Sequence, residues 1–193
     1  MFQQRFGELE AAVCACEYTV HQETVSEEAM YGRVRDLLTQ SGSIYVIGNG
    51  GSAGIASHFS NDLMKALKIP SHTLYDSNLL TCLANDYGYA EVFSYPLDIL
   101  LKPGDVLVAI SSSGKSTNIV KAAQIAKDRG ASVIALTGFS HDNPLRKLGS
   151  LSFWIDRSDY GIVETAHFFL LHTIVDVMQR DARRTREYAE HTV

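Results

Sequence analysis

Residues 44–68, IYVIGNGGSAGIASHFSNDLMKALK, decide the fold of this chain. The first four residues are β-branched and aromatic types typical of a buried strand, and apolar residues recur at helical spacing from Ile55 onward. Residues 48–52 between them are mostly glycine, so the stretch predicts a strand, a glycine turn and a helix. Such a turn lets backbone N–H groups and the Ser52 hydroxyl converge on an anion at the helix N-terminus. The stretch therefore predicts a phosphate site, although many buried strands enter helices through glycine without a ligand.

Composition and charge narrow the class of protein. The chain has 193 residues, 46% hydrophobic and 20% charged, which is typical of one soluble globular domain. Its net charge of −5 disfavours a nucleic-acid partner, because nucleic acids require a basic surface. Cys14, Cys16 and Cys82 lack metal-type spacing, and one would stay unpaired in any disulfide scheme, which indicates a cytoplasmic location. We expect no membrane span and no signal peptide, because no apolar run is long enough.

The elements around this stretch alternate in type. Two amphipathic segments before it, residues 2–21 and about 26–40, predict helices that cover an oligomer interface or pack on their own domain. Further strands are expected at residues 72–75, 106–110, 131–137 and 151–155, with helices or turns between them. A long apolar helix is expected from about residue 160 to 179 or beyond, followed by a charged tail whose end would fray. This alternation predicts a parallel, doubly wound sheet with helices on both faces.

A second loop has the side chains that most clearly indicate phosphate binding. Residues 111–116, SSSGKS, follow a strand of continuous apolar residues and open a helix. Ligands of open α/β sheets bind at this edge, and the hydroxyls of Ser111, Ser112, Ser113 and Ser116 can donate to phosphate oxygens. A helix cap is the alternative, but a cap needs only one serine. The loop lacks the first glycine of a Walker motif, so ATP hydrolysis is not expected.

Four segments together carry a family resemblance: GNGGS at residues 48–52, NDYGY at 85–89, SSSGKS at 111–116 and ALTG at 135–138. The chain resembles the SIS (sugar isomerase) domain family, and within it the phosphoheptose isomerase group, over about residues 35–180. The resemblance implies a three-layer α/β sandwich, with a five-stranded parallel sheet flanked by helices and two extra N-terminal helices. Residues 1–193 would then form a single SIS domain, with N-terminal helices in residues 1–40 and the α/β core in residues 41–180.

The resemblance also implies a function. Members of the group isomerise sedoheptulose 7-phosphate to D-glycero-D-manno-heptose 7-phosphate for surface polysaccharides, as cytoplasmic homotetramers with active sites at subunit interfaces. The implied partner is therefore a small phosphosugar, with no nucleic acid and no membrane. The alternative is a non-catalytic SIS protein, such as a sensor of phosphosugars or a tetrameric scaffold that binds a replication initiator.

The family pattern assigns roles to particular residues. It places Asp62 and His172 as the catalytic base and acid, and His58, Asp62, Glu164 and His172 as ligands of one zinc ion per subunit. The substrate contacts that it implies are Asn49, Gly50, Gly51, Ser52, Asp62, Asn85, Asp86, Ser111, Ser112, Ser113, Ser116 and Glu164.

Helical spacing supports part of this assignment. His58 and Asp62 are four residues apart and share a helix face, while His172 lies two turns beyond Glu164, with His167 between them. Imidazole and carboxylate groups are suitable zinc ligands. A lone histidine on an amphipathic helix is nevertheless more often a satisfied side chain, and the pair at 58 and 62 could be a simple helix-face hydrogen bond.

Several positions depart from the family pattern. Asp62 stands where glutamate is usual, and Glu164 where glutamine is usual, which adds negative charge at the implied metal site. An aspartate expected just before the last helix is Gly161, with Asp159 nearby, and an arginine expected after position 62 has no match. These changes lie at the sugar end of the implied site. We therefore expect phosphosugar binding more firmly than any one sugar, and a variant branch of the group.

Overall fold

The computed structural model describes the backbone of residues 1–190 and the side chains of residues 1–184. Its sheet has the strand order β2-β1-β7-β6-β5-β3-β4. The strands are β1 (Glu17–Val20), β2 (Glu23–Val25), β3 (Ile44–Gly48), β4 (Ser71–His72), β5 (Val106–Ser111), β6 (Ser132–Thr137) and β7 (Leu151–Trp154). Strands β3 to β7 run parallel, as predicted, whereas β1 and β2 are antiparallel.

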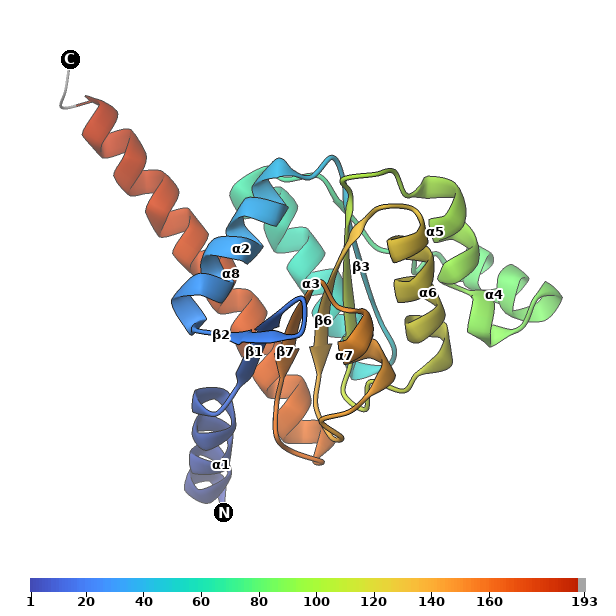
Figure 1. The fold of residues 1–193 in the computed structure, drawn as a ribbon, viewed down its shortest axis with the longest axis horizontal. Helices are drawn as coiled ribbons and strands as arrows, with labels where there is room; N and C mark the ends of the chain where they lie inside the picture. The colour runs from blue at the N-terminus through green and yellow to red at the C-terminus, as the bar shows by residue number, and fades with distance from the viewer. Residues whose placement is uncertain (191–193) are drawn as a thin grey trace.

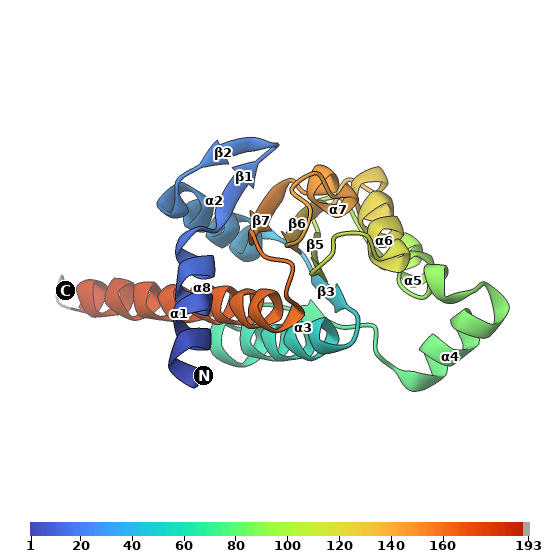
Figure 2. The same cartoon turned by 90° about the horizontal axis from the view of Figure 1, so that it is seen from below.

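Helices cover both faces of the sheet. They are α1 (Phe2–Cys14), α2 (Glu27–Gln40), α3 (Gly51–Asp62), the π-helix η1 (Leu63–Leu67), α4 (Ser77–Asp86), the 3₁₀-helix η2 (Tyr89–Glu91), α5 (Ser94–Leu100), α6 (Thr117–Asp128), α7 (Pro144–Leu148) and α8 (Tyr160–Glu190). Helices α2, α3 and α8 pack on one face, and α5, α6 and α7 on the other (Figures 1 and 2). The predicted three-layer α/β architecture is therefore confirmed.

The central strands are buried on both faces because their apolar side chains alternate between two cores. Val46 of β3 packs with Val108 of β5 on the α3/α8 side, whereas Ile47 and Ala109 pack on the α5/α6 side. In register, Gly48 pairs with Ile110. The carboxyl ends of β3 and β5 are therefore level, and the loops that follow them leave the sheet at the same edge.

The N-terminal region differs from the prediction. Instead of a helix over residues 2–21, α1 ends at Cys14 and residues 17–25 form the β1–β2 hairpin, with Tyr18 paired to Phe153 of β7. This segment is rich in β-branched and aromatic residues, and pairing satisfies the otherwise open edge of β7. The parallel part of the sheet has five strands, but with this hairpin the sheet has seven strands within residues 1–190, so the predicted total of five was wrong.

Helix α8 extends past residue 179, as the sequence analysis allowed. It continues through the charged tail to Glu190, and the final three residues lie outside the described part. By length and composition alone, residues 160–184 could cross a bilayer, contrary to what we expected from the sequence. Core helices pass the same test, and half of the most apolar window is buried inside the protein, so this is weak evidence for a membrane span.

Candidate functional site

The two predicted loops meet around one cavity. Its volume is about 290 Å³, and it lies at the carboxyl ends of β3 and β5. It is lined by Asn49, Gly50, Gly51, Ser52, Ile110, Ser111, Ser112, Ser113, Ser116, Tyr160 and Glu164. We call this cavity the serine pocket. All the residues predicted in the GNGGS and SSSGKS loops as phosphate contacts line it.

The backbone of both loops suits a bound anion. Gly50 has φ +55°, and a Cβ atom on Gly48 would lie 2.6 Å from the Ser52 carbonyl oxygen, so glycine is required at both positions. Helix α3 begins after Gly50 and α6 after Ser116, and neither N-cap residue makes a side-chain capping hydrogen bond. Two uncapped helix N-termini therefore start at one pocket, where their N–H groups favour negative charge.

Side chains of the two loops are linked to each other. Asn49 and Asn118 exchange two amide hydrogen bonds of 2.9 Å, and the Ser111 hydroxyl donates to Ser116 Oγ over 3.2 Å. Ser112 Oγ is buried and has no hydrogen-bond partner among the described residues. Asn118 was not predicted as a site residue, although it stands only two residues after the serine loop. Ser116, the N-cap residue of α6, makes no side-chain capping hydrogen bond, so the structure does not support the helix-cap alternative.

Asn85 and Asp86 do not line the serine pocket. They are exposed at the end of α4, where the Asn85 amide donates to Asp86 Oδ1 over 2.8 Å. Helix α4 projects from the body of the protein (Figures 1 and 2). The residue of the NDYGY segment that reaches the pocket lining is Tyr89, whose hydroxyl donates to Asn49 Oδ1 over 3.2 Å.

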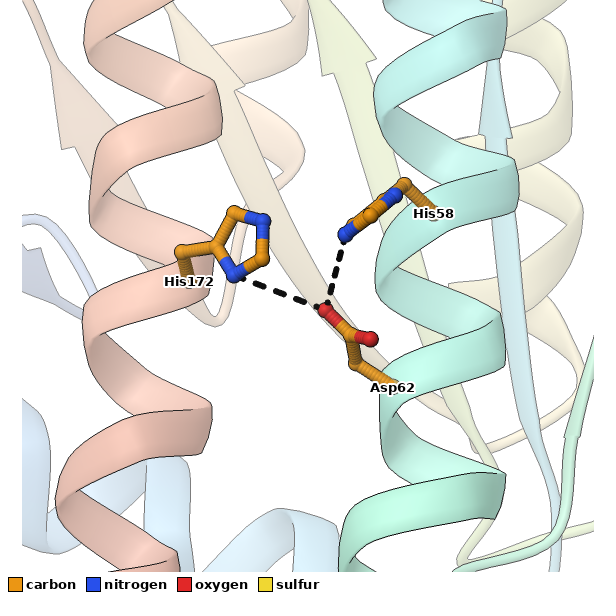
Figure 3. Close-up of side chains that lie close together, drawn as sticks. All are labelled: His58, Asp62 and His172. Carbon is orange, nitrogen blue, oxygen red and sulfur yellow. Dashed lines mark ion pairs between the residues drawn. The ribbon is translucent and has the colours of Figure 1, made fainter.

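Three of the four predicted metal ligands converge between α3 and α8 (Figure 3). His58 Nε2 lies 3.2 Å and His172 Nδ1 lies 3.5 Å from the same oxygen, Asp62 Oδ2. The Phe168 ring packs edge-to-face against both imidazoles, with centroids at 5.1 and 4.7 Å. Asp62 also stands where α3 widens into the π-helical turn η1, a feature concentrated at functional sites.

Glu164 lies outside this cluster. Its carboxylate packs so closely on Gly51 that a Cβ atom at position 51 would collide with Oε2. Both residues line the serine pocket and also an adjoining groove of about 350 Å³, which reaches His58. Glu164 and Gly51 therefore stand at the junction between the anion-binding loops and the histidines.

His167 lies in the protein core rather than at the candidate site. It is fully buried, and its Nε2 lies 3.1 Å from the Thr137 carbonyl oxygen. Burial lowers the pKa of His167 to about 4, because the charged imidazolium cannot be solvated there. The imidazole is therefore neutral near pH 7 and ties α8 to the end of β6.

The cluster of His58, Asp62 and His172 fits a zinc ion by the chemistry of its donors. Two imidazole nitrogens and one carboxylate oxygen lie within 4.8 Å of one another. Three protein ligands with a remaining open position are typical of catalytic zinc sites. Exposed carboxylates are common without any ion, so the donor set permits the metal without requiring it.

Comparison with known proteins identifies the family. A model described as the SIS domain matches residues 19–138, which is more than half of the chain. The chain belongs to the SIS domain family.

Curated relatives that match nearly the whole chain include phosphoheptose isomerases. The enzyme of Chromohalobacter salexigens is 33% identical over 188 residues, covering 93% of this chain and 95% of that protein. The enzyme of Campylobacter concisus is 34% identical, covering 86% and 95%. The solved phosphoheptose isomerase of Neisseria gonorrhoeae is 30% identical, with a TM-score of 0.77 over 93% of this chain and all of that one. The predicted family and the predicted class of enzyme, an aldose–ketose isomerase, are confirmed.

Proposed function

We propose that this SIS-domain protein converts sedoheptulose 7-phosphate to D-glycero-D-manno-heptose 7-phosphate, or acts on a closely related ketose phosphate. The observation that carries the proposal is the continuity of the site: the serine pocket joins, through Gly51 and Glu164, a groove that reaches His58. One end of the site suits a phosphate, and the groove at the other end reaches His58, which contacts Asp62.

The separation of the two ends suits a sugar phosphate. The carbonyl of a ketose phosphate of this kind lies at the opposite end of the carbon chain from the phosphate. His58 stands six residues after Ser52 on α3, which at 1.5 Å per residue is about 9 Å along the helix. A phosphate held by the serine pocket would therefore leave the reacting carbons near His58.

Asp62 and His172 would carry the proton transfers. Both histidine contacts go to Asp62 Oδ2, so Oδ1 remains available to take the proton beside the substrate carbonyl. His172 uses Nδ1 toward Asp62, which leaves Nε2 to return a proton to the neighbouring atom. Pairing with the imidazoles keeps the carboxylate oriented between the two helices, and donors around the groove would stabilise the enediolate.

A zinc ion would be held by His58, Asp62 and His172, with Glu164 as a predicted fourth ligand that stands outside the cluster here. When bound, such an ion supplies electrophilic stabilisation of negative charge on oxygen.

We infer that residues 1–193 form a single domain and that the protein works in the cytoplasm, in heptose and surface polysaccharide biosynthesis.

We also infer that the protein is a homotetramer with active sites at subunit interfaces. The exposed rings of Tyr87 and Tyr95, stacked with centroids 4.8 Å apart beside the projecting α4, support a subunit contact there. Such a contact would bring Asn85 and Asp86 to a partner's pocket.

Solvent exchange tests the proposed reaction. Incubation with sedoheptulose 7-phosphate in D₂O should give the aldose product with deuterium at the carbon beside the carbonyl. NMR spectroscopy measures this incorporation. Asp62→Asn and His172→Gln should each lower kcat by about 10²–10⁴-fold, because each removes a proton-transfer group. Asp98→Asn is the matched control, since Asp98 is exposed and paired with Arg129.

Two results would contradict the proposal. Near-normal turnover in either variant would remove the catalytic roles of Asp62 and His172. Tight binding of ketose phosphates with no exchange in any of them would instead favour the non-catalytic alternative.

A further inference from the structure

The first residue of α8 places an aromatic ring at the serine pocket. Tyr160 lines the pocket, although 60% of its surface is exposed. It stands one turn before Glu164, which lines the same pocket and the groove toward His58. An exposed aromatic ring at the edge of a polar pocket offers a flat apolar surface to whatever occupies that pocket.

A strained residue supports this ring. Phe139 has φ +56°, a left-handed conformation that bulky residues rarely adopt, and its ring packs edge-to-face on Tyr160 with centroids 4.9 Å apart. Such a conformation persists only when its surroundings hold it, and strain of this kind concentrates at functional sites. Phe139, in the loop that follows β6, therefore packs against Tyr160 and holds its ring in place.

Backbone hydrogen bonds connect this support to the serine loop. The N–H of Gly138 donates to the Ser112 carbonyl over 2.8 Å, and the next N–H, of Phe139, donates to the Arg157 carbonyl over 2.8 Å. The loops after β5, β6 and β7 are thus joined in sequence at one edge of the sheet. The position of Tyr160 relative to the serine hydroxyls is consequently set by the main chain.

The carboxylate of Asp159, the residue before Tyr160, is paired with groups outside the pocket. Asp159 lies 3.1 Å from the Arg5 guanidinium of α1 and accepts a hydrogen bond from the N–H of Ile162, so it caps α8. It does not line the serine pocket. With glycine at position 161, this part of the pocket edge presents the Tyr160 ring rather than an acidic side chain.

We propose that Tyr160 is a specificity-determining residue that packs against the C–H face of the sugar, and that Phe139 is a positioning residue acting through it. The inference rests on the proposed function, because it takes the pocket's ligand to be a phosphosugar. The ring contacts the substrate equally before and during reaction. Its loss should therefore raise KM and leave kcat unchanged.

Calorimetric titration with two probes tests the role of Tyr160. Tyr160→Ala should weaken binding of sedoheptulose 7-phosphate about five- to tenfold and leave binding of inorganic phosphate unchanged, because inorganic phosphate has no C–H face. Tyr160→Phe should bind both probes as the wild type does. Phe169→Ala is the control, since Phe169 is also exposed on α8 but does not line the pocket.

A double-mutant cycle tests Phe139. Glycine tolerates positive φ, so Phe139→Gly keeps the loop conformation while removing the ring. It should weaken sedoheptulose 7-phosphate binding, and Phe139→Gly combined with Tyr160→Ala should bind no worse than Tyr160→Ala alone. Additive losses would overturn the positioning role of Phe139.

The outcomes separate this inference from the proposed function. Turnover with sedoheptulose 7-phosphate, but equal binding by wild type and Tyr160→Ala, would overturn the inference alone. Binding without turnover would overturn the proposed reaction, while a selective loss in Tyr160→Ala would still support the aromatic contact. A wild-type protein that binds sedoheptulose 7-phosphate no more tightly than inorganic phosphate would overturn the inference, because the sugar would then contribute nothing.

Discussion

At the residue scale, Ser112 is a predicted phosphate contact whose hydroxyl group makes no hydrogen bond within the described part of the chain. Its hydroxyl is buried at the serine pocket and has no partner among the described residues, whereas the Ser111 hydroxyl next to it bonds Ser116. A buried polar group without a partner costs free energy in the unliganded fold. A phosphate oxygen would supply the missing partner.

Ser112→Ala should therefore separate stability from binding. The free energy of unfolding should stay the same or rise by up to about 1 kcal/mol, while affinity for inorganic phosphate should fall about tenfold. Urea denaturation and calorimetry measure the two effects. Ser152→Ala should behave in the opposite way, because that hydroxyl donates to the Arg146 carbonyl far from the pocket. A loss of stability with unchanged phosphate affinity in Ser112→Ala would contradict this view.

At the scale of elements, an ion pair joins the β1–β2 hairpin to helix α7. Glu17 of β1 pairs with the largely buried Arg146 of α7, whose guanidinium lies 5.2 Å from the centroid of the Trp154 ring. Removing one member of such a pair leaves the other charge poorly solvated. The pair therefore anchors the hairpin to the parallel part of the sheet.

Glu17→Gln should lower the free energy of unfolding by about 2 kcal/mol, less than for a fully buried pair because Glu17 is partly exposed. Urea denaturation gives the value. Asp36→Asn should change it by less than about 0.5 kcal/mol, because the Arg35–Asp36 pair is exposed. Equal effects of the two substitutions would show that Arg146 does not depend on Glu17.

At the scale of the whole molecule, the three layers bury a titratable group. His167 projects from α8 into the core and bonds the end of β6, so it must be neutral in the folded protein. Its pKa is lowered from 6.5 to about 4 by burial, while the unfolded chain retains the ordinary value. The unfolded state therefore binds the proton more readily between these two pH values.

The stability that His167 contributes should be fully present above pH 6.5 and lost as the pH falls toward 4. At about 1.4 kcal/mol per pKa unit, the loss is on the order of 3 kcal/mol. His167→Gln, which retains a donor for Thr137, should flatten the dependence of unfolding free energy on pH in this range. His72→Gln, at an exposed histidine, should leave that dependence unchanged. Parallel curves for wild type and His167→Gln would refute the assignment.

Much of the fold and part of the site follow from local sequence. Continuous apolar runs such as residues 106–110 require burial on both faces, and parallel strands bring their carboxyl ends to one edge. Local patterns alone therefore place Ser52 and Ser113 at one pocket. His58 and Asp62 share a helix face because four residues make about one turn.

Only the tertiary structure determined the contacts between segments that are distant in sequence. Helical spacing could not show that residues 17–25 would complete the edge of β7, that Glu164 would pack on Gly51 or that His167 would turn inward. Nor could it show that Phe139 supports Tyr160. Periodicity specifies which side of an element is apolar, whereas the partner on that side is set by how whole layers pack, which no local pattern encodes.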